Sequence, residues 1–225
     1  MGAGFTIRFI RVVTRFYGLF FQGIVMTLLL ATITVLFGTV LGALLAVCKM
    51  SRFKPISWLS SSYIEVIRGT PLLLQLYFFY FALTQMITFI KLTKFSATAT
   101  ALALNVAAYM AEIIRSGIQS IDKGQTEAAR SLGLTSRQTM MHIVLPQAVK
   151  NILPAIVNEF ITTIKQTSLA STFFVGDLMT QFNTIRGITY LSFEPLLVVG
   201  IIYFVLTTVL SKLAAMYEMR LMASD

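Results

Sequence analysis

The segment from Gly23 to Val47 carries no charged side chain. Its length of about 25 residues exceeds the roughly 20 that a helix needs to cross the hydrocarbon core of a bilayer. Only 12% of the 225 residues are charged, whereas a soluble domain contains about 25%. These observations exclude an ordinary soluble domain and predict an all-α, polytopic membrane helical bundle.

Five apolar stretches predict about five transmembrane helices in a single domain, residues 1–225, whose segment 1–18 is amphipathic. The predicted spans are Phe20–Val47, Ile56–Ile90, Ala97–Gln119, Ile143–Lys165 and Phe193–Met216. The second is too long for one crossing, so we expect its start to lie along the interface or beside the bundle. Arg68–Gly69–Thr70–Pro71 should break it. Residues 171–187 indicate a short helix plus loop.

The distribution of Lys and Arg indicates the orientation, because cytoplasmic loops carry an excess of both. Placing the loop after the third span in the cytoplasm puts ten basic residues inside and six outside. We therefore expect a cytoplasmic C-terminus and an N-terminus outside, although the basic N-terminal segment disagrees with this assignment. The net charge of +9 then reflects membrane topology and not a nucleic-acid surface. The single cysteine, Cys48, excludes an internal disulfide.

A polar loop interrupts the apolar chain at about residues 120–146. Asp122, with Gln125 three residues later, fits the capping-box pattern at the start of a short helix. Thr135 and Gln138 repeat this pattern at the start of a second helix. The loop is therefore predicted to fold into two short helices.

The first of these helices should lie across the membrane surface. Gly133 stands where the helix should end, a position that favours a left-handed residue. Ala128 and Ala129 leave the helix face thin, so another protein surface can approach closely. Glu127 and Arg130 are spaced i,i+3 and can pair on this helix.

These residues resemble the EAA signature of importer permeases of the ATP-binding cassette (ABC) class. Glu127-Ala128-Ala129, Gly133 and Ile143-x-Leu145-Pro146 stand at the spacing of that signature. The stretches SSYIEVIRGTPLLLQL, ALALNVAAYMAEIIRSGIQSID and NEFITTIKQTSLAS resemble the polar amino-acid subfamily. The resemblance covers nearly the whole chain and is weakest in the first residues.

The resemblance implies that the first short helix is a coupling helix, which docks on a cytoplasmic ATPase. It assigns the coupling to Glu127, Ala128, Ala129, Arg130, Gly133, Leu145 and Pro146. The chain has no phosphate-binding loop of the Gly-x-x-x-x-Gly-Lys-Ser/Thr type. ATP and Mg are therefore expected on a partner ATPase dimer, and this chain is expected to hold no cofactor and to be no enzyme.

The resemblance also implies the setting in which the chain works. The other expected partners are a second permease subunit, identical or related, and an extracytoplasmic substrate-binding protein. The expected location is the lipid bilayer of a bacterial plasma (inner) membrane, with no nucleic-acid partner. Alternating access of a central cavity is the implied mechanism.

Polar groups inside membrane spans are costly and are usually paired or functional. The candidate substrate-binding residues are Asn105, Thr70, Lys165, Gln166, Thr167 and Ser168. Asn105 lies in the middle of a span, so its amide needs either another helix or a ligand, and the resemblance favours the ligand. An ammonium group beside several donors at the end of the fourth span suits a carboxylate. The alternative for Lys165 is anchoring at the interface.

Other features of the spans have structural explanations. Glu65–Arg68 and Glu112–Arg115 are spaced i,i+3, and each pair can neutralise itself on one helical face. Gly38 and Gly42 form a GxxxG pair, which lets helices approach closely and is expected to pack within the subunit.

The expected function is import of a polar amino acid into the cytoplasm. Lys165 would attract the α-carboxylate of any amino acid, whereas the neutral Gln166 favours a neutral polar substrate, such as glutamine or a cystine-like compound. A basic or acidic amino acid is the alternative. Two other classes are a membrane enzyme, for which the single histidine His142 has no obvious relay, and an uncoupled channel-like subunit. No metal site is expected.

Overall fold

The computed structural model describes residues 2–86 and 92–222, and every regular element in this part of the chain is helical. The α-helices are α1 Gly2–Lys49, α2 Lys54–Gly69, α3 Leu72–Met86, α4 Lys94–Gln119, α5 Lys123–Ser131, α6 Ser136–Thr139, α7 Leu145–Gln166, α8 Leu178–Thr189 and α9 Phe193–Met222. A π-helical turn, Met140–Val144, precedes α7, and a 3-10 helix, Thr167–Phe173, follows it. Among the described residues, four helices can cross a membrane, or five if α2 and α3 form one broken span. The predicted all-α membrane bundle is confirmed.

The helix α4 is the most buried of these spans, because its many small residues let neighbouring helices approach closely. α1 packs against it at Gly38 and Gly42. A Cβ atom at Gly38 would lie 2.6 Å from Cγ1 of Val106, and one at Gly42 would lie 2.5 Å from Cβ of Met110. The GxxxG pair therefore packs within the subunit, as expected.

The second predicted span is broken, as expected, between α2 and α3. The two helices meet at an angle of 119°. Thr70 is extended, with φ −121° and ψ 152°, because Pro71 disfavours a helical conformation in the residue before it. Ile90, the predicted end of the span, lies outside the described residues.

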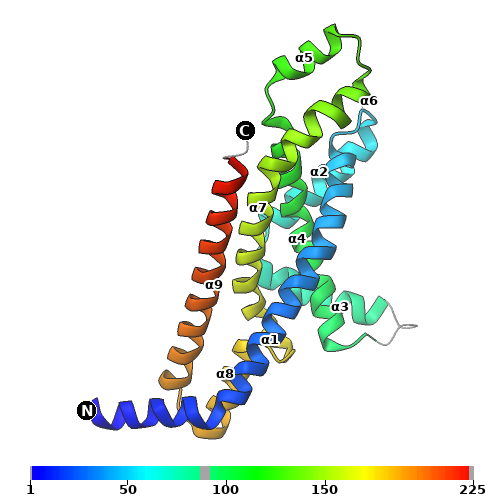
Figure 1. The fold of residues 1–225 in the computed structure, drawn as a ribbon. Helices are drawn as coiled ribbons and strands as arrows, with labels where there is room; N and C mark the ends of the chain where they lie inside the picture. The colour runs from blue at the N-terminus through cyan, green and yellow to red at the C-terminus, as the bar shows by residue number, and fades with distance from the viewer. Residues whose placement is uncertain (1, 87–91, 223–225) are drawn as a thin grey trace.

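The helix α1 begins at Gly2 and runs without interruption through the start of the predicted first span at Phe20. No proline separates the amphipathic segment from the span, so one helix continues through both. In Figure 1 the dark blue start of α1 lies across the end of the bundle where α8 is found. Val12 and Phe16 are buried in a cluster with side chains of α8 and α9.

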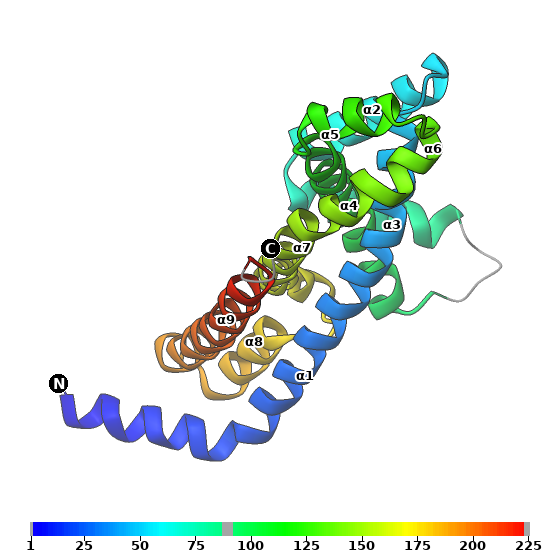
Figure 2. The same ribbon diagram turned by 45° about the horizontal axis from the view of Figure 1, so that its top comes forward.

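Residues 171–187 form a turn and a short helix, as expected. Phe174 and Gly176 have positive φ values of 53° and 89° and reverse the chain after the 3-10 helix. Asp177 then caps α8 by accepting a hydrogen bond from the backbone N–H of Met179 at 3.0 Å. Figure 2 shows α8 between α9 and α1.

The first prediction concerns the α1–α4 contact. Gly42→Ala places a methyl group against Met110, so we expect the free energy of unfolding to fall by about 1–3 kcal/mol, the usual cost of overpacking. Gly18→Ala in the same helix is the matched control, because no atom lies within 4 Å of its Cβ position. Thermal unfolding in detergent measures both variants, and equal midpoints would contradict the packing role of Gly42.

Candidate functional site: the coupling loop and the polar groups of the spans

The helices α5 and α6 stand at the end of the bundle opposite α8 and the N-terminus (Figure 1). Asp122 caps α5 by accepting a hydrogen bond of 2.6 Å from the backbone N–H of Gly124. The expected capping box is wrong, because the Gln125 side chain does not accept a hydrogen bond from the backbone N–H of Asp122. The Asp122 carboxylate already takes the second N–H of the helix, and the backbone N–H of Gln125 bonds to the Asp122 carbonyl at 3.1 Å.

The turn between α5 and α6 is held by hydrogen bonds at both helix ends. Gly133 has a φ of +86°, as expected for a left-handed residue. The N–H groups of Gly133 and Leu134 donate to the carbonyls of Arg130 and Ala129 at 3.0 and 3.1 Å, which makes a Schellman motif. The Thr135 capping box with Gln138 is confirmed, with both reciprocal bonds present. The loop is therefore a defined piece of surface.

The outer face of α5 is free for contact with another molecule. Glu127 and Ala128 are exposed, and Ala129 is buried beneath them. The possible Glu127–Arg130 pair does not form, because Arg130 Nη1 donates to the Leu134 carbonyl at 2.7 Å. Within the described part of the chain Glu127 makes no ion pair. An unpaired carboxylate thus remains on the exposed face.

The loop joins α7 through the π-helical turn without a break in helical structure. Leu145 begins α7 and is half-buried, and Pro146 is exposed in its first turn. Proline is tolerated in a first turn, because its missing N–H has no partner there. The helical run into α7 therefore begins at α6, and the turn at Gly133 joins it to the predicted coupling residues on α5.

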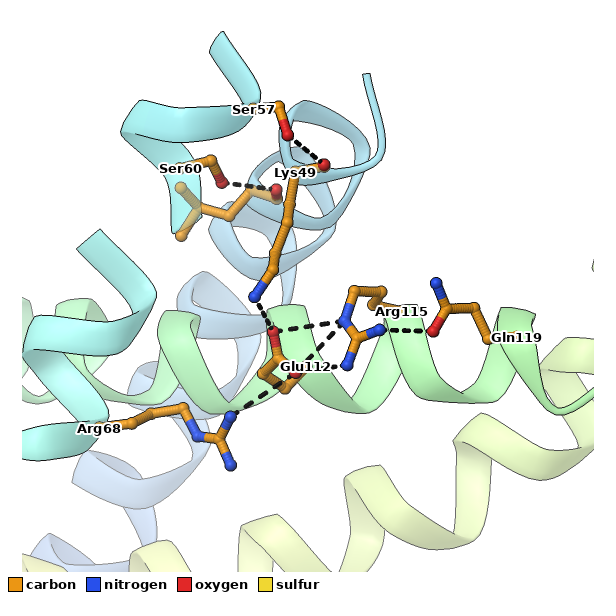
Figure 3. A network of polar contacts seen from close by, with 8 residues as sticks. Lys49, Ser57, Ser60, Arg68, Glu112, Arg115 and Gln119 are labelled. Atoms are coloured by element: carbon orange, nitrogen blue, oxygen red, sulfur yellow. Dashed lines mark hydrogen bonds and ion pairs between the residues drawn. The ribbon is translucent and has the colours of Figure 1, made fainter. Parts of the chain in front are cut away.

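A carboxylate on α4 draws in basic side chains from the ends of α1 and α2 and from α4 itself (Figure 3). Glu112 lies 2.6 Å from Lys49 of α1 and 2.8 Å from Arg115 of α4. Arg68 of α2 reaches it at 3.6 Å. The Glu112–Arg115 pair is confirmed, but the Glu65–Arg68 pair is wrong. Arg68 turns toward Glu112 and the ring of Tyr109, and Glu65 is left exposed.

The amide of Asn105 is not alone in the middle of α4. It is buried and donates a hydrogen bond of 2.6 Å to Oε1 of Gln75 on α3. Gln75 Nε2 in turn donates to the hydroxyl of Thr70 at 2.7 Å and to the carbonyl of Ile67 at 2.6 Å. The structure thus brings Thr70 and Asn105 together through Gln75. Oδ1 of Asn105 stays buried without a hydrogen-bond partner.

Sequence analysis missed Gln75. It is the only amide in the apolar stretch PLLLQLYFF, and that isolation is the signal that could have found it. The network satisfies carbonyl groups that the break between α2 and α3 leaves without helical partners. It therefore has a structural role at the break, in addition to any contact with a ligand.

A cavity of about 560 Å³ lies at the end of α7, beside α9. Lys165, Ser168 and Ser171 contribute polar groups to its wall, and Tyr203 of α9 lines the other side. Thr70 and Asn105 do not line it. Thr167 is buried and donates its hydroxyl to the Ile164 carbonyl at 2.7 Å, so it is satisfied within the helix.

Gln166 lies outside this lining, on a different face of α7 from Lys165. Its Oε1 atom is buried without a hydrogen-bond partner, and so is Oε1 of Glu159. The two residues are seven apart, which places them on one face of the helix. Across the described residues, no group of three or more His, Cys, Asp or Glu side chains could hold a metal ion.

The apolar spans, one of them broken, and the exposed helical loop define a multi-pass membrane subunit. A sequence model described as "binding-protein-dependent transport system inner membrane component" matches residues 38–222. The chain therefore belongs to this family, which comprises the permease subunits of ABC transporters.

Relatives of this chain are amino-acid permeases. An arginine transport system permease protein, ArtQ, of Bacillus subtilis is 43% identical over 91% of this chain and 93% of its own length. A putative glutamine transport system permease protein, GlnP, of Rickettsia bellii is 40% identical over 90% and 93%. A solved amino acid ABC transporter with histidines superposes with a TM-score of 0.88 at 47% identity, covering 92% of this chain and 96% of that one. The chain is thus similar to permeases that are named for the transport of different amino acids.

The fold also extends to more distant transporters. The MetNI methionine ABC transporter, in an inward-facing conformation, superposes with a TM-score of 0.77 at 19% identity. The match covers 92% of this chain and 98% of that one. It shows that the arrangement of helices is shared although most of the sequence differs.

The second prediction concerns the Glu112 ion network. Glu112→Gln leaves Lys49 and Arg115 partly buried without a counter-charge, so we expect the free energy of unfolding to fall by about 2 kcal/mol. The control is Glu65→Gln, which removes an exposed carboxylate and should change stability by less than about 0.5 kcal/mol. Unfolding midpoints in the same detergent measure both variants. Similar losses for the two would show that the network adds no stability.

Proposed function

We propose that this chain is the permease subunit of an importer that moves a polar amino acid into the cytoplasm, driven by ATP hydrolysis on a partner protein. The observation that carries the proposal is the rigid, exposed helix α5 at one end of a membrane bundle. Its outer face presents the unpaired Glu127 beside small residues. A surface of this kind suits a groove on a water-soluble partner, into which a thin helix face can be inserted.

The proposed assembly has two permease subunits, identical or related, and a pair of cytoplasmic ATPases that hold ATP and Mg. An extracytoplasmic binding protein delivers the substrate. Motion of the ATPase pair moves α5, and the hydrogen bonds of the Schellman motif and the Thr135 capping box keep the loop rigid during that motion. The unbroken helical run from α6 into α7 passes the movement to the span that carries Glu159, Lys165 and Gln166.

The proposed orientation follows from this assembly. If α5 faces the cytoplasm, α8 and the start of α1 lie at the outer face, because they stand at the other end of the bundle. The Lys and Arg count favours the same orientation. The N-terminus is then outside and the C-terminus is cytoplasmic.

For the substrate we favour a neutral polar amino acid. Lys165 and Ser168 line one cavity, where the ammonium group of Lys165 suits the α-carboxylate. The Ser168 hydroxyl donates to the Lys165 carbonyl at 2.7 Å. The unsatisfied Oε1 of Gln166 would accept a hydrogen bond from a neutral donor such as a side-chain amide. The relative named for glutamine transport is consistent with this choice.

A basic amino acid is the second candidate, and one observation favours it. Oε1 of Glu159 is also unsatisfied and shares a face of α7 with Gln166. A carboxylate there would attract a cationic side chain, whereas Gln166 alone would not. The relative named for arginine transport agrees with this alternative.

The third prediction tests the coupling role of α5. In the complete complex with its ATPase, Glu127→Ala should reduce substrate-stimulated ATP hydrolysis by at least about tenfold, the effect of losing one central interface contact. Gly133→Val should do the same, because a β-branched residue is strained at positive φ.

Two matched variants serve as controls. Gln125→Ala removes another exposed polar side chain of α5, and Gly133→Asn keeps a residue that tolerates a left-handed conformation. Both should retain most of the stimulation. If both Glu127→Ala and Gly133→Val keep wild-type stimulation of ATP hydrolysis, α5 has no role in coupling.

The fourth prediction concerns substrate charge. In proteoliposomes that carry the whole complex, glutamine should compete with the transported substrate at least about tenfold better than arginine does, a difference of ~1.4 kcal/mol. Gln166→Glu should shift the preference toward arginine. If the wild type instead prefers arginine and Glu159→Gln loses that preference, the substrate is a basic amino acid.

A further inference from the structure

The first part of α1, from Ile7 to Phe21, presents three different faces. One face is accounted for, because Val12 and Phe16 are buried against α8 and α9. The segment lies across the end of the bundle instead of along it (Figures 1 and 2). Its other two faces are mostly exposed, and one is basic whereas the other is apolar.

The second face is basic. Arg8, Arg11 and Arg15 are spaced at i, i+3 and i+7, so they form one row along the helix. Arg8 is paired with Glu194 of α9 at 2.6 Å, which holds the segment in place. Arg11 and Arg15 are exposed and make no ion pair among the described residues. Two positive charges are therefore available on this face.

The third face is apolar and unusually exposed. Ile7, Ile10, Tyr17 and Phe21 are 58%, 55%, 73% and 65% exposed. They lie in a row whose centre is roughly a third of a turn around the helix from the centre of the arginine row. The one polar residue within this row, Thr14, donates its hydroxyl to the Ile10 carbonyl at 2.9 Å. The row therefore offers almost no polar group to water.

Together these two faces favour a membrane surface over other occupants. A basic row beside an apolar row is the pattern of a helix that lies in the interface plane, with its apolar face about 5–10 Å into the headgroup and acyl boundary. The arginines then reach headgroup phosphates. The segment also continues into a span that crosses the bilayer, so it lies near the membrane–water interface. A second copy of the chain would have to supply acidic groups opposite Arg11 and Arg15.

We infer that residues 7–21 of α1 form an interfacial helix that binds anionic phospholipid. Ile7, Ile10, Tyr17 and Phe21 enter the acyl region, and Arg11 and Arg15 contact headgroup phosphates. The Arg8–Glu194 ion pair and the contacts of Val12 and Phe16 fix its position relative to α9 and α8. The inference does not depend on the transported substrate or on the ATPase.

A fluorescence experiment tests the position of the apolar face. The full chain with Cys48→Ser and Ile10→Cys is labelled with an environment-sensitive dye and placed in phosphatidylglycerol-containing vesicles. A lipid with a quencher near the top of its acyl chain should remove about half of the fluorescence, as expected at a depth of 5–10 Å. The same dye at Leu132→Cys in the exposed polar loop should be quenched by aqueous iodide and not by the lipid.

Two outcomes would overturn the inference. Protection of the Ile10 probe from both quenchers would mean that a second protein surface covers it. Quenching by iodide alone would mean that the apolar face is in water.

A second measurement tests the arginines. Arg11→Gln with Arg15→Gln should weaken the preference for phosphatidylglycerol over phosphatidylcholine by about tenfold or more, judged by lipid retained on the purified protein. Arg11→Lys with Arg15→Lys keeps both charges and should retain the preference. An unchanged preference in the glutamine variant would show that these arginines bind no anionic lipid.

Discussion

The close approach of α1 to α4 is the contact on which the other parts of this structure depend. Lipid tails provide no hydrophobic drive to bring two apolar helices together, so van der Waals packing over a small-residue surface has to do so. Gly38 and Gly42 provide that surface, opposite Val106 and Met110. With α4 fixed in this way, its polar side chains are held at defined heights, Asn105 in the middle and Glu112 toward the coupling loop.

Those two polar residues link α4 to the broken span. Asn105 bonds to α3 through Gln75, and Glu112 draws in Arg68 at the end of α2. Both partners lie close to the break at Thr70, where the backbone has lost helical hydrogen bonds. A movement of α2 relative to α3 therefore has to change contacts with α4 at two points. This arrangement connects the polar middle of the membrane with the end that carries α5.

Local patterns in the sequence predicted most of the features that depend on neighbouring residues, such as helix caps and helix breaks. The Thr135 capping box, the left-handed Gly133 and the break before Pro71 depend on residues within a few positions of one another, and all three are confirmed. Long-range partners were not accessible in this way. Arg68 pairs with Glu112 and not with Glu65, and Asn105 bonds to Gln75. Both pairings join helices that meet only after folding. The substrate residues were predicted as one group, yet Lys165 and Ser168 share a cavity that Asn105 and Thr70 do not line.

The π-helical turn at Met140–Val144 sets the rotational phase between the coupling loop and the span. A π turn contains one residue more than the α-helical turn that it replaces. Because each residue of an α-helix advances it by about 100° and 1.5 Å, conversion of this turn to regular α-helix would swing α5 around the axis of α7 and alter its height. The single extra residue therefore determines the direction in which Glu127 points relative to the axis of α7.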